Sequence, residues 1–256
     1  MTALYDSIGR TYSGRRESDP RIAAAIEATI DGCTSILNVG AGTGSYEPAS
    51  KSLIAIEPSR TMIAQRPRGA APVVQGFAES LPFREGSFDA VLGILTLHHW
   101  KDKEKGFSEC RRVARSRVVF FTIDFDVCVR FWLFDYFPEL IIDRQIFPSI
   151  ERYADFFQSV ELMPVPIPAD CRDGFLGAYW KRPRAYLDPL VRASISTFSR
   201  IGDIGVNLAR LEADIDSGAW QQRYSDLQHL GALDLGYRLV IARKPTDCKQ
   251  NQRSRP

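Results

Sequence analysis

Residues 36–57 read ILNVGAGTGSYEPASKSLIAIE, and no other stretch of the chain says as much about its fold and function. The apolar run at its start is typical of a short buried strand, and alternating glycines between Gly40 and Gly44 follow directly. A second apolar run ends at Glu57. A glycine-rich turn lets backbone N–H groups approach a ligand closely, because no Cβ stands in the way. A carboxylate at the end of the second strand can accept hydrogen bonds from both hydroxyls of a ribose. The stretch therefore predicts a nucleoside-binding site.

The spacing of the glycines narrows the kind of nucleoside site. Dinucleotide-binding turns favour G-x-G-x-x-G, in which the third glycine lets the helix pack closely on the strand beneath a pyrophosphate. This turn reads G-x-G-x-G, and Ser45 stands where the dinucleotide spacing needs a glycine. The phosphate-binding pattern G-x-x-x-x-G-K-[ST] is absent from the chain. The turn therefore disfavours a nicotinamide dehydrogenase and excludes a P-loop.

Strand and helix patterns alternate along most of the chain, which is typical of a doubly wound parallel sheet. Asp19 and Pro20 form a start signal for the first helix. Only about seven residues, Pro48 among them, can form a helix between the first two strands, so we expect one or two turns there. We predict an α/β fold with a mostly parallel, seven-stranded sheet. Its strands are expected at 35–39, 53–56, 73–76, 88–95, 117–123, 160–165 and 237–242, and its helices at 21–30, 60–65, 103–114 and 150–158.

Two long segments interrupt this alternation. Residues 125–148 are rich in aromatic side chains, and residues 169–232 show helical periodicity at 187–198 and 206–215. Both segments begin at the carboxyl ends of strands, where open α/β sheets bind ligands, so we interpret them as cap insertions over a substrate. The 256 residues are then one domain, with a lid and helix in 1–32, a nucleoside-binding half in 33–124 and a tail in 244–256.

The charge distribution argues against nucleic acid as a partner. The formal net charge of the chain is +2. The residues from 243 onward include five basic side chains and one acid, so this end alone carries a net charge of +4. The body therefore carries about −2, without a basic stripe of the kind that nucleic-acid binding requires. The tail lacks large apolar residues, and we expect it to be disordered.

Cysteine usage and hydropathy argue against a disulfide-rich, zinc-binding, secreted or membrane-spanning protein. The five cysteines are scattered and have no C-x-x-C spacing, so we expect neither a disulfide framework nor a metal site. The N-terminus shows no apolar signal region, and no apolar run approaches the length that spans a bilayer. We expect a cytoplasmic monomer or homodimer that does not bind membranes.

Several motifs in register resemble one family. The glycine turn resembles motif I of the class I S-adenosylmethionine (SAM) methyltransferases, in particular the small-molecule branch called type 11. Three further motifs follow in the order and spacing of that family: AESLPF at 78–83, SFDAV at 87–91 and LTLHHW at 95–100. The resemblance covers residues 36–100 and implies SAM as cofactor and methyl transfer as the reaction.

The resemblance also implies which residues hold SAM. The turn would pass close to its methionine part, Glu57 would bind the ribose, and the segment ending the fourth strand would direct the methyl toward the acceptor. Asn38 stands where an acid is common, and Phe77 stands where an aspartate often meets the adenine amine. The implied cofactor residues are Asn38, Gly40, Ala41, Gly42, Gly44, Glu57, Phe77, Ala78, Glu79, Leu95 and Thr96.

The acceptor side is predicted less sharply. Methyl transfer from a sulfonium is an in-line displacement, so it needs proximity and alignment rather than a covalent nucleophile or a metal. His98 and His99 are candidate general bases, and we expect at most one of them to face the pocket. Candidate substrate-binding residues are three acids after strand ends, Asp124, Asp170 and Asp173, which could instead be turn or cap residues. Two N-terminal aromatics that resemble the family's lid, Tyr5 and Tyr12, are further candidates.

Three functions remain open. A small-molecule methyltransferase acting on oxygen, nitrogen or carbon agrees best with these features. A nucleic-acid or protein methyltransferase is disfavoured, because the fourth strand ends in GILTL rather than [ND]-P-P-[YF] and the body lacks a basic face. A SAM-binding regulatory protein without turnover is the third, since Asn38, Phe77 and the short first crossover depart from the family.

Overall fold

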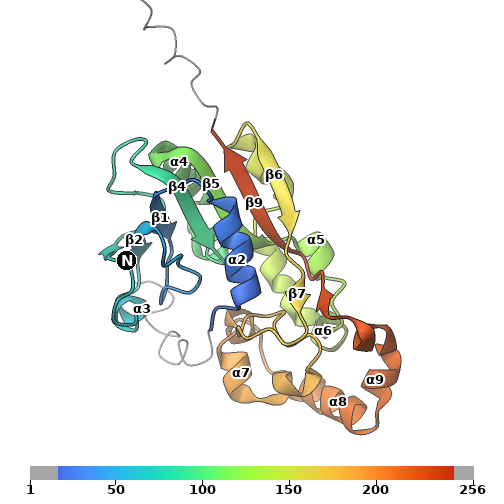
Figure 1. Cartoon of the computed structure of the whole chain (residues 1–256). Helices are drawn as coiled ribbons and strands as arrows, with labels where there is room; N and C mark the ends of the chain where they lie inside the picture. The colour runs from blue at the N-terminus through green and yellow to red at the C-terminus, as the bar shows by residue number, and fades with distance from the viewer. Residues whose placement is uncertain (1–16, 245–256) are drawn as a thin grey trace, which may run out of the picture.

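The computed structural model describes residues 17–244, which form a seven-stranded sheet with helices on both faces (Figure 1). The strand order is β3-β2-β1-β4-β5-β9-β6. The strands β1 to β5 run parallel, whereas β9 is antiparallel to both of its neighbours. The predicted mostly parallel, doubly wound sheet is confirmed. Its strands are β1 (Ser35–Val39), β2 (Ser52–Glu57), β3 (Val73–Gln75), β4 (Phe88–Ile94), β5 (Ala114–Ile123), β6 (Val160–Pro164) and β9 (Tyr237–Arg243).

The strand β1 lies at the point where the strand order reverses. It pairs with β2 on one side and β4 on the other, and Asn38 lies level with Ala55 and Leu92. Chain connections leave a crevice at such a reversal, beyond the carboxyl ends of the strands. The glycine turn follows β1 directly and therefore lies at this crevice.

Helices cover the two faces of the sheet and bury separate cores. The helix α2 (Pro20–Thr29) lies in front of the sheet in Figure 1, and α4 (Lys103–Val113) lies behind it. The side chain of Asp19 accepts a hydrogen bond from the Arg21 N–H and caps α2, as the sequence predicts. On the opposite face, η5 (Ile150–Asp155) is a 3₁₀-helix, and its buried Tyr153 packs against Phe107 of α4.

The first crossover contains no helix, and here the sequence-based expectation is wrong. Residues 40–51 form turns only. Pro48 cannot donate a backbone hydrogen bond, and Tyr46 has a left-handed φ of 63°, so a continuous helix cannot form. The Tyr46 hydroxyl instead donates to Asp173, at 2.8 Å, and its N–H donates to the Ser18 hydroxyl, also at 2.8 Å. The crossover is thus anchored by contacts with distant segments.

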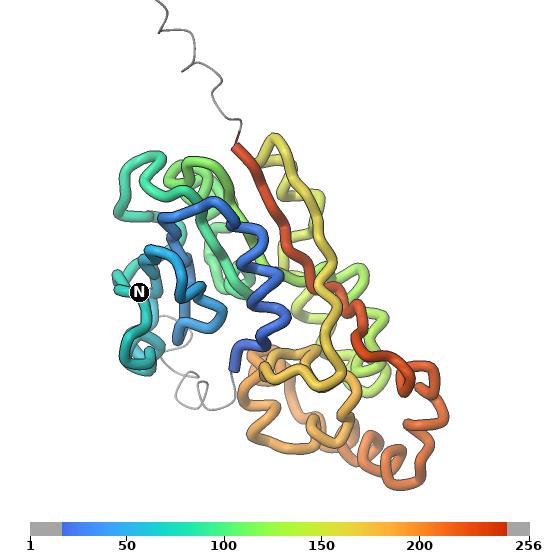
Figure 2. Tube along the Cα trace, viewed as in Figure 1, coloured from blue at the N-terminus to red at the C-terminus, as the bar shows by residue number. Residues whose placement is uncertain are grey.

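The two segments that interrupt the alternation lie together beyond the carboxyl ends of the parallel strands (Figures 1 and 2). The indole N–H of Trp132 donates to the carbonyl of Trp180, and the Tyr136 hydroxyl donates to Asp214. The first segment contains α5 (Phe125–Cys128), α6 (Leu133–Tyr136) and η4 (Pro138–Gln145). The second contains η6 (Pro183–Leu187), α7 (Pro189–Ala193), η7 (Ser196–Ser199), α8 (Gly205–Asp216), α9 (Ala219–Arg223) and η8 (Ser225–His229).

A small two-stranded sheet closes the base of the second segment. The strands β7 (Ile167–Pro168) and β8 (Ala232–Leu233) pair antiparallel, so the chain enters and leaves this segment at one place. The remaining helices are α3 (Arg60–Ala64) and η3 (Leu97–His99). Within residues 17–244, no helix has the length and apolar character needed to cross a bilayer.

Candidate functional site

The glycine turn is built so tightly that side chains would not fit. Gly40, Gly42 and Gly44 have φ values of +71°, +54° and +97°, which glycine adopts without strain. The N–H groups of Gly40 and Ala41 both donate to the carbonyl of Ile56, at 2.8 and 2.9 Å. A Cβ on Gly40 would lie 1.9 Å from Oγ1 of Thr96. The turn is therefore pressed against the segment that follows β4.

Glu57 lies at the end of β2 and binds this turn. Its Oε2 accepts from the N–H of Gly42 at 2.8 Å, and its Oε1 accepts from the N–H of Ser59 at 2.9 Å. Glu57 is buried. A carboxylate offers about four acceptor positions, so it can hold the turn and receive hydroxyl donors as well. The geometry agrees with the ribose role that the sequence suggests, which stays a prediction.

A buried ion pair lies beneath the turn, and sequence reasoning did not find it. Arg66 Nη2 and Glu47 Oε2 are 2.6 Å apart, and the two side chains are only 5% and 9% exposed. Arg66 also donates to the carbonyl oxygens of Gly42 and Ala71. The other oxygen of Glu47 accepts from the amide nitrogen of Asn38 at 3.1 Å. No motif marks Glu47 and Arg66, because the two residues are 19 positions apart and neither belongs to the glycine pattern.

The segment expected near the adenine is held by α4. Glu79 Oε1 accepts from the backbone N–H groups of Lys101 and Asp102, at 2.8 and 3.2 Å, just before that helix begins. Ala78 is buried and Phe77 is half-buried. The carboxylate of Glu79 therefore orders the entry to α4, and the role of these three residues in binding a ring stays a prediction.

The chain leaves β4 through a strained residue that brings two histidines together. Leu95 has a left-handed φ of 47°, and its N–H donates to the carbonyl of Phe121 at 2.8 Å. The ring of His98 stacks on Phe147, with centroids 4.3 Å apart and an interplanar angle of 18°. The centroid of His99 is 3.7 Å from that of His98.

The two histidines differ in their surroundings. Burial, together with the nearby positive charges of Arg200 and Lys103, lowers the pKa of His99 to about 3. His99 is therefore uncharged at neutral pH and a weak base. His98 lines a pocket, to which His99 does not contribute a lining side chain. The geometry favours His98 over His99 as the candidate base.

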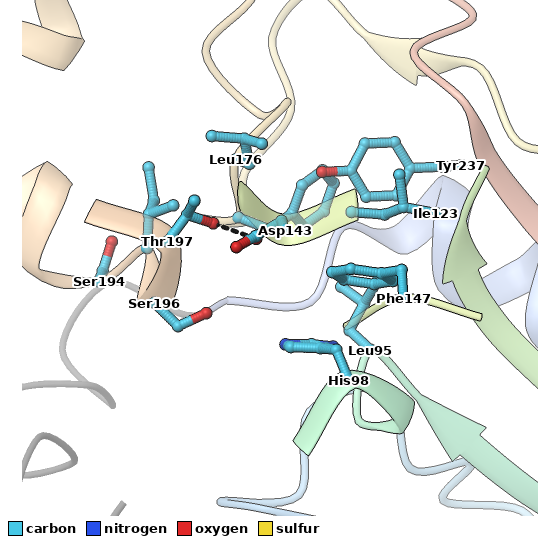
Figure 3. A pocket seen from close by; sticks show the side chains of 12 residues that line it. Leu95, His98, Ile123, Asp143, Phe147, Leu176, Ser194, Ser196, Thr197 and Tyr237 are labelled. Carbon is cyan, nitrogen blue, oxygen red and sulfur yellow. Dashed lines mark hydrogen bonds between the residues drawn. The ribbon is translucent and has the colours of Figure 1, made fainter. Parts of the chain in front are cut away.

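The pocket lies between the strand ends and the two interrupting segments (Figure 3). About 460 Å³ of space lies between its walls, part of it open to solvent. Figure 3 shows the rings of His98 and Phe147 on one side and Asp143 with Thr197 on another. Its lining residues are Leu95, His98, Ile123, Asp143, Phe147, Phe175, Leu176, Ser194, Ile195, Ser196, Thr197 and Tyr237.

One buried charge faces this pocket and is compensated. Asp143 is 5% exposed and forms an ion pair with Arg200, which is 26% exposed. The hydroxyl of Thr197 donates to the same carboxylate at 2.5 Å. Because a buried charge must be paired, these three side chains fix η4 and η7 relative to each other.

The acids that the sequence suggested for acceptor binding lie elsewhere. Asp173 accepts from the Tyr46 hydroxyl and from the N–H of Gly174. Asp124 caps α5, and exposed Asp170 pairs with Arg21. None of the three lines the pocket, so their geometry supports the alternative of turn and cap residues. The suggested lid residues Tyr5 and Tyr12, and the tail beyond residue 244, lie outside the described part of the chain. Across residues 17–244, no group of three or more metal-ligating side chains was found.

Comparison with known proteins places this geometry in a family. The family model described as a methyltransferase domain matches residues 37–122. A solved structure from Anabaena variabilis, named as a candidate methyltransferase from an antibiotic biosynthesis pathway, is 34% identical with a TM-score of 0.83. That likeness covers 90% of this chain and 99% of the other.

Curated relatives match over shorter ranges. The rice chloroplastic 2-methyl-6-phytyl-1,4-hydroquinone methyltransferase 2 is 26% identical over 142 residues, 52% of this chain and 40% of the relative. A tRNA (carboxymethyluridine(34)-5-O)-methyltransferase of Xenopus tropicalis is 27% identical over 115 residues, 44% of this chain and 18% of the relative. The chain thus spans less than half the length of either curated relative. Together with the glycine turn and Glu57 at the reversal of strand order, the nearly full-length likeness shows that the chain belongs to the type 11 branch of the class I SAM-dependent methyltransferases.

Proposed function

We propose that this protein transfers the methyl group of SAM to a small-molecule acceptor bound in the pocket beside β4. One observation carries the proposal: the glycine turn and the pocket share a single segment. Gly40 is pressed against Thr96, and the neighbouring residues Leu95 and His98 line the pocket. A donor on the turn and an acceptor in the pocket would therefore meet at residues 95–98, as an in-line displacement requires.

The residues around the turn fit SAM. Gly40, Gly42 and Gly44 form a cradle that side chains would fill, and Glu57 offers a carboxylate. Asn38 holds a buried amide oxygen that no donor in residues 17–244 reaches. When bound, SAM supplies a methyl group activated on a sulfonium. The protein's own contribution is to hold donor and acceptor in line, which can supply about 7–11 kcal/mol toward the barrier.

The pocket walls indicate the chemistry of the acceptor. Most of the lining side chains are apolar or aromatic, and the one carboxylate among them, Asp143, is paired with Arg200. Such walls suit a small, partly apolar and uncharged molecule that bears a hydroxyl or amine. An O–H or N–H acceptor loses a proton when it is methylated, and the His98 imidazole at the pocket wall is placed to accept it.

The interrupting segments are the substrate cap in this proposal. They supply Asp143, Phe147 and the residues 194–197 of the pocket wall, whereas the sheet supplies its floor. A macromolecular acceptor, such as the tRNA named for one relative, has less support, because the chain before residue 243 carries a net charge of about −2.

A labelled-methyl screen tests the proposal. Purified protein, SAM with an isotopically labelled methyl group and fractionated small-molecule extracts are expected to give a labelled product together with S-adenosylhomocysteine. Binding of SAM without transfer to any fraction would favour the regulatory function, and labelling of RNA alone would favour the macromolecular one.

Histidine variants then test the role of His98. For an O–H or N–H acceptor, His98→Ala is expected to lower kcat/KM by about 10²–10⁴-fold, the usual contribution of a positioned base, without changing the affinity for S-adenosylhomocysteine. The matched control is His229→Ala, since His229 is exposed and lies outside the pocket. Equal activity of the two variants would remove His98 from the proposed mechanism.

A further inference from the structure

The buried Arg66–Glu47 ion pair beneath the glycine turn also contacts the side-chain amide of Asn38 in the proposed cofactor site. Arg66 binds one oxygen of Glu47 at 2.6 Å, and the other oxygen accepts from Nδ2 of Asn38 at 3.1 Å. All three side chains are at least nine-tenths buried. Arg66 also donates to the Gly42 carbonyl at 3.2 Å, so the same guanidinium contacts the turn itself.

This arrangement determines which way the Asn38 amide faces. A carboxylate can only accept hydrogen bonds, so the NH₂ group of Asn38 must face Glu47 and its oxygen must face away. Arg66 pairs with the other oxygen of Glu47, so each oxygen of this carboxylate has a donor. Asn38 is only 1% exposed, and its Oδ1 has no hydrogen-bond partner within residues 17–244. A buried acceptor without a donor is costly, and it is typical of a site that a ligand completes.

We infer that Glu47 and Arg66 are positioning residues, which hold the Asn38 amide so that its oxygen, not its nitrogen, meets the ammonium group of SAM. The inference rests on the proposed function, because SAM is the ligand. Family members commonly carry an acid at the position of Asn38, and there both oxygens accept, so no orientation has to be selected. In this chain the orientation has to be imposed, and the Arg66–Glu47 pair imposes it. The ammonium group then meets a neutral oxygen that Glu47 polarises through the NH₂ group.

The chain of contacts from Arg66 through Glu47 to Asn38 is called the relay below. Replacing the carboxylate of Glu47 by an amide tests the inference. In Glu47→Gln, Arg66 still requires an acceptor, so the side-chain oxygen of residue 47 turns to Arg66 and its NH₂ group to Asn38. The Asn38 amide must then turn over, which directs its NH₂ group at the ammonium of the ligand. In the double variant Glu47→Gln/Asn38→Asp, residue 38 again presents an oxygen to the ligand. Its other oxygen accepts from the NH₂ group of residue 47, because a carboxylate accepts at both oxygens.

Calorimetric titration with two ligands separates positioning from general damage. S-adenosylhomocysteine carries the ammonium group, whereas 5′-methylthioadenosine lacks the amino-acid end. Glu47→Gln is expected to lower the affinity for S-adenosylhomocysteine by about tenfold or more, because a hydrogen bond to a charged group is lost. The affinity for 5′-methylthioadenosine is expected to fall by less than about twofold. The double variant Glu47→Gln/Asn38→Asp is expected to bind S-adenosylhomocysteine more tightly than Glu47→Gln alone.

Asn38→Ala is the second variant, because it removes the amide and leaves the Arg66–Glu47 ion pair intact. It is expected to lose affinity for S-adenosylhomocysteine only. Equal losses for both ligands, or no rescue in the double variant, would overturn the inference and make the relay a structural support of the turn. Failure of the unaltered protein to bind either ligand would instead contradict the proposed function.

Discussion

The two sides of the site are constructed differently. The donor side is built from neighbouring strands and the turns between them, and its polar groups are fixed by a buried ion pair within residues 38–66. The acceptor side is assembled from distant segments, with its ion pair between η4 and the residue after η7. The polar groups of the proposed donor side are therefore fixed by local contacts, whereas the shape of the proposed acceptor pocket depends on how the cap packs.

The largest effect is expected from breaking the donor-side ion pair. Arg66→Met leaves the Glu47 charge buried without its partner, which should lower the free energy of unfolding by about 3–5 kcal/mol. Arg200→Met should cost less, because Arg200 is more exposed and Thr197 still donates to Asp143. Urea unfolding of both variants measures the difference.

The double variant Arg66→Met/Glu47→Met is the control, and it should recover most of the lost stability because no buried charge remains. Equal losses in the two single variants would mean that the donor side is no more rigid than the cap.

The second effect concerns affinity on the donor side. Glu57→Ala removes the acceptor for the N–H groups of Gly42 and Ser59 as well as the predicted ribose contact. Affinity for S-adenosylhomocysteine should fall by about tenfold or more, as expected when hydrogen bonds to a charged group are lost. Calorimetry checks this, with Glu57→Gln expected to be intermediate. Unchanged affinity would show that Glu57 does not bind the ribose.

A smaller effect is expected on the acceptor side. Phe147→Leu removes the ring on which His98 stacks but keeps an apolar wall. Loss of an aromatic pair should lower kcat/KM for the acceptor by about three- to tenfold, while the affinity for S-adenosylhomocysteine stays the same. Leu190→Ala, at an exposed position outside the pocket, is the control. A matching loss of S-adenosylhomocysteine affinity would show that the two sides are not independent.

The smallest effect is a pH dependence of stability. The pKa of His99 falls from its ordinary value of 6.5 to about 3 in the folded protein, so the unfolded chain takes up a proton first as the pH falls. The contribution of His99 to stability is therefore fully present above pH 6.5 and is lost progressively toward pH 3. Urea midpoints at pH 7 and pH 5 should differ less in His99→Gln than in the unaltered protein. An identical difference would place the acid sensitivity at other groups.

The fold around the proposed donor side could be predicted from sequence because its signals are local. The predicted strands agree with the observed ones to within three residues at each end, since apolar runs bounded by glycine and proline mark them. The turn and Glu57 are separated by one short crossover, so their meeting follows from parallel pairing of β1 with β2. The orientation of the Asn38 amide could not be predicted, because it depends on Glu47, which in turn pairs with Arg66 after α3.

The acceptor side could not be predicted, because its contacts join segments far apart in the chain. Asp143 and Thr197 are 54 residues apart, and nothing in either neighbourhood points to the other. Apolar positions at helical spacing indicate helical structure at 187–198, and Asp188 and Pro189 start a new helix inside that range. The structure has three short helices there, and their breaks place residues 194–197 at the pocket. The capping signal of Asp188 and Pro189 therefore divides a segment whose apolar positions alone are compatible with a continuous helix.

Calorimetric titration of the unaltered protein with S-adenosylhomocysteine, beside NAD under the same conditions, tests whether the turn at 40–44 and Glu57 form the donor site of a methyltransferase. We expect saturable binding of S-adenosylhomocysteine at one site per chain and no binding of NAD, because the glycine spacing is wrong for a dinucleotide. Binding of NAD without S-adenosylhomocysteine would contradict this assignment.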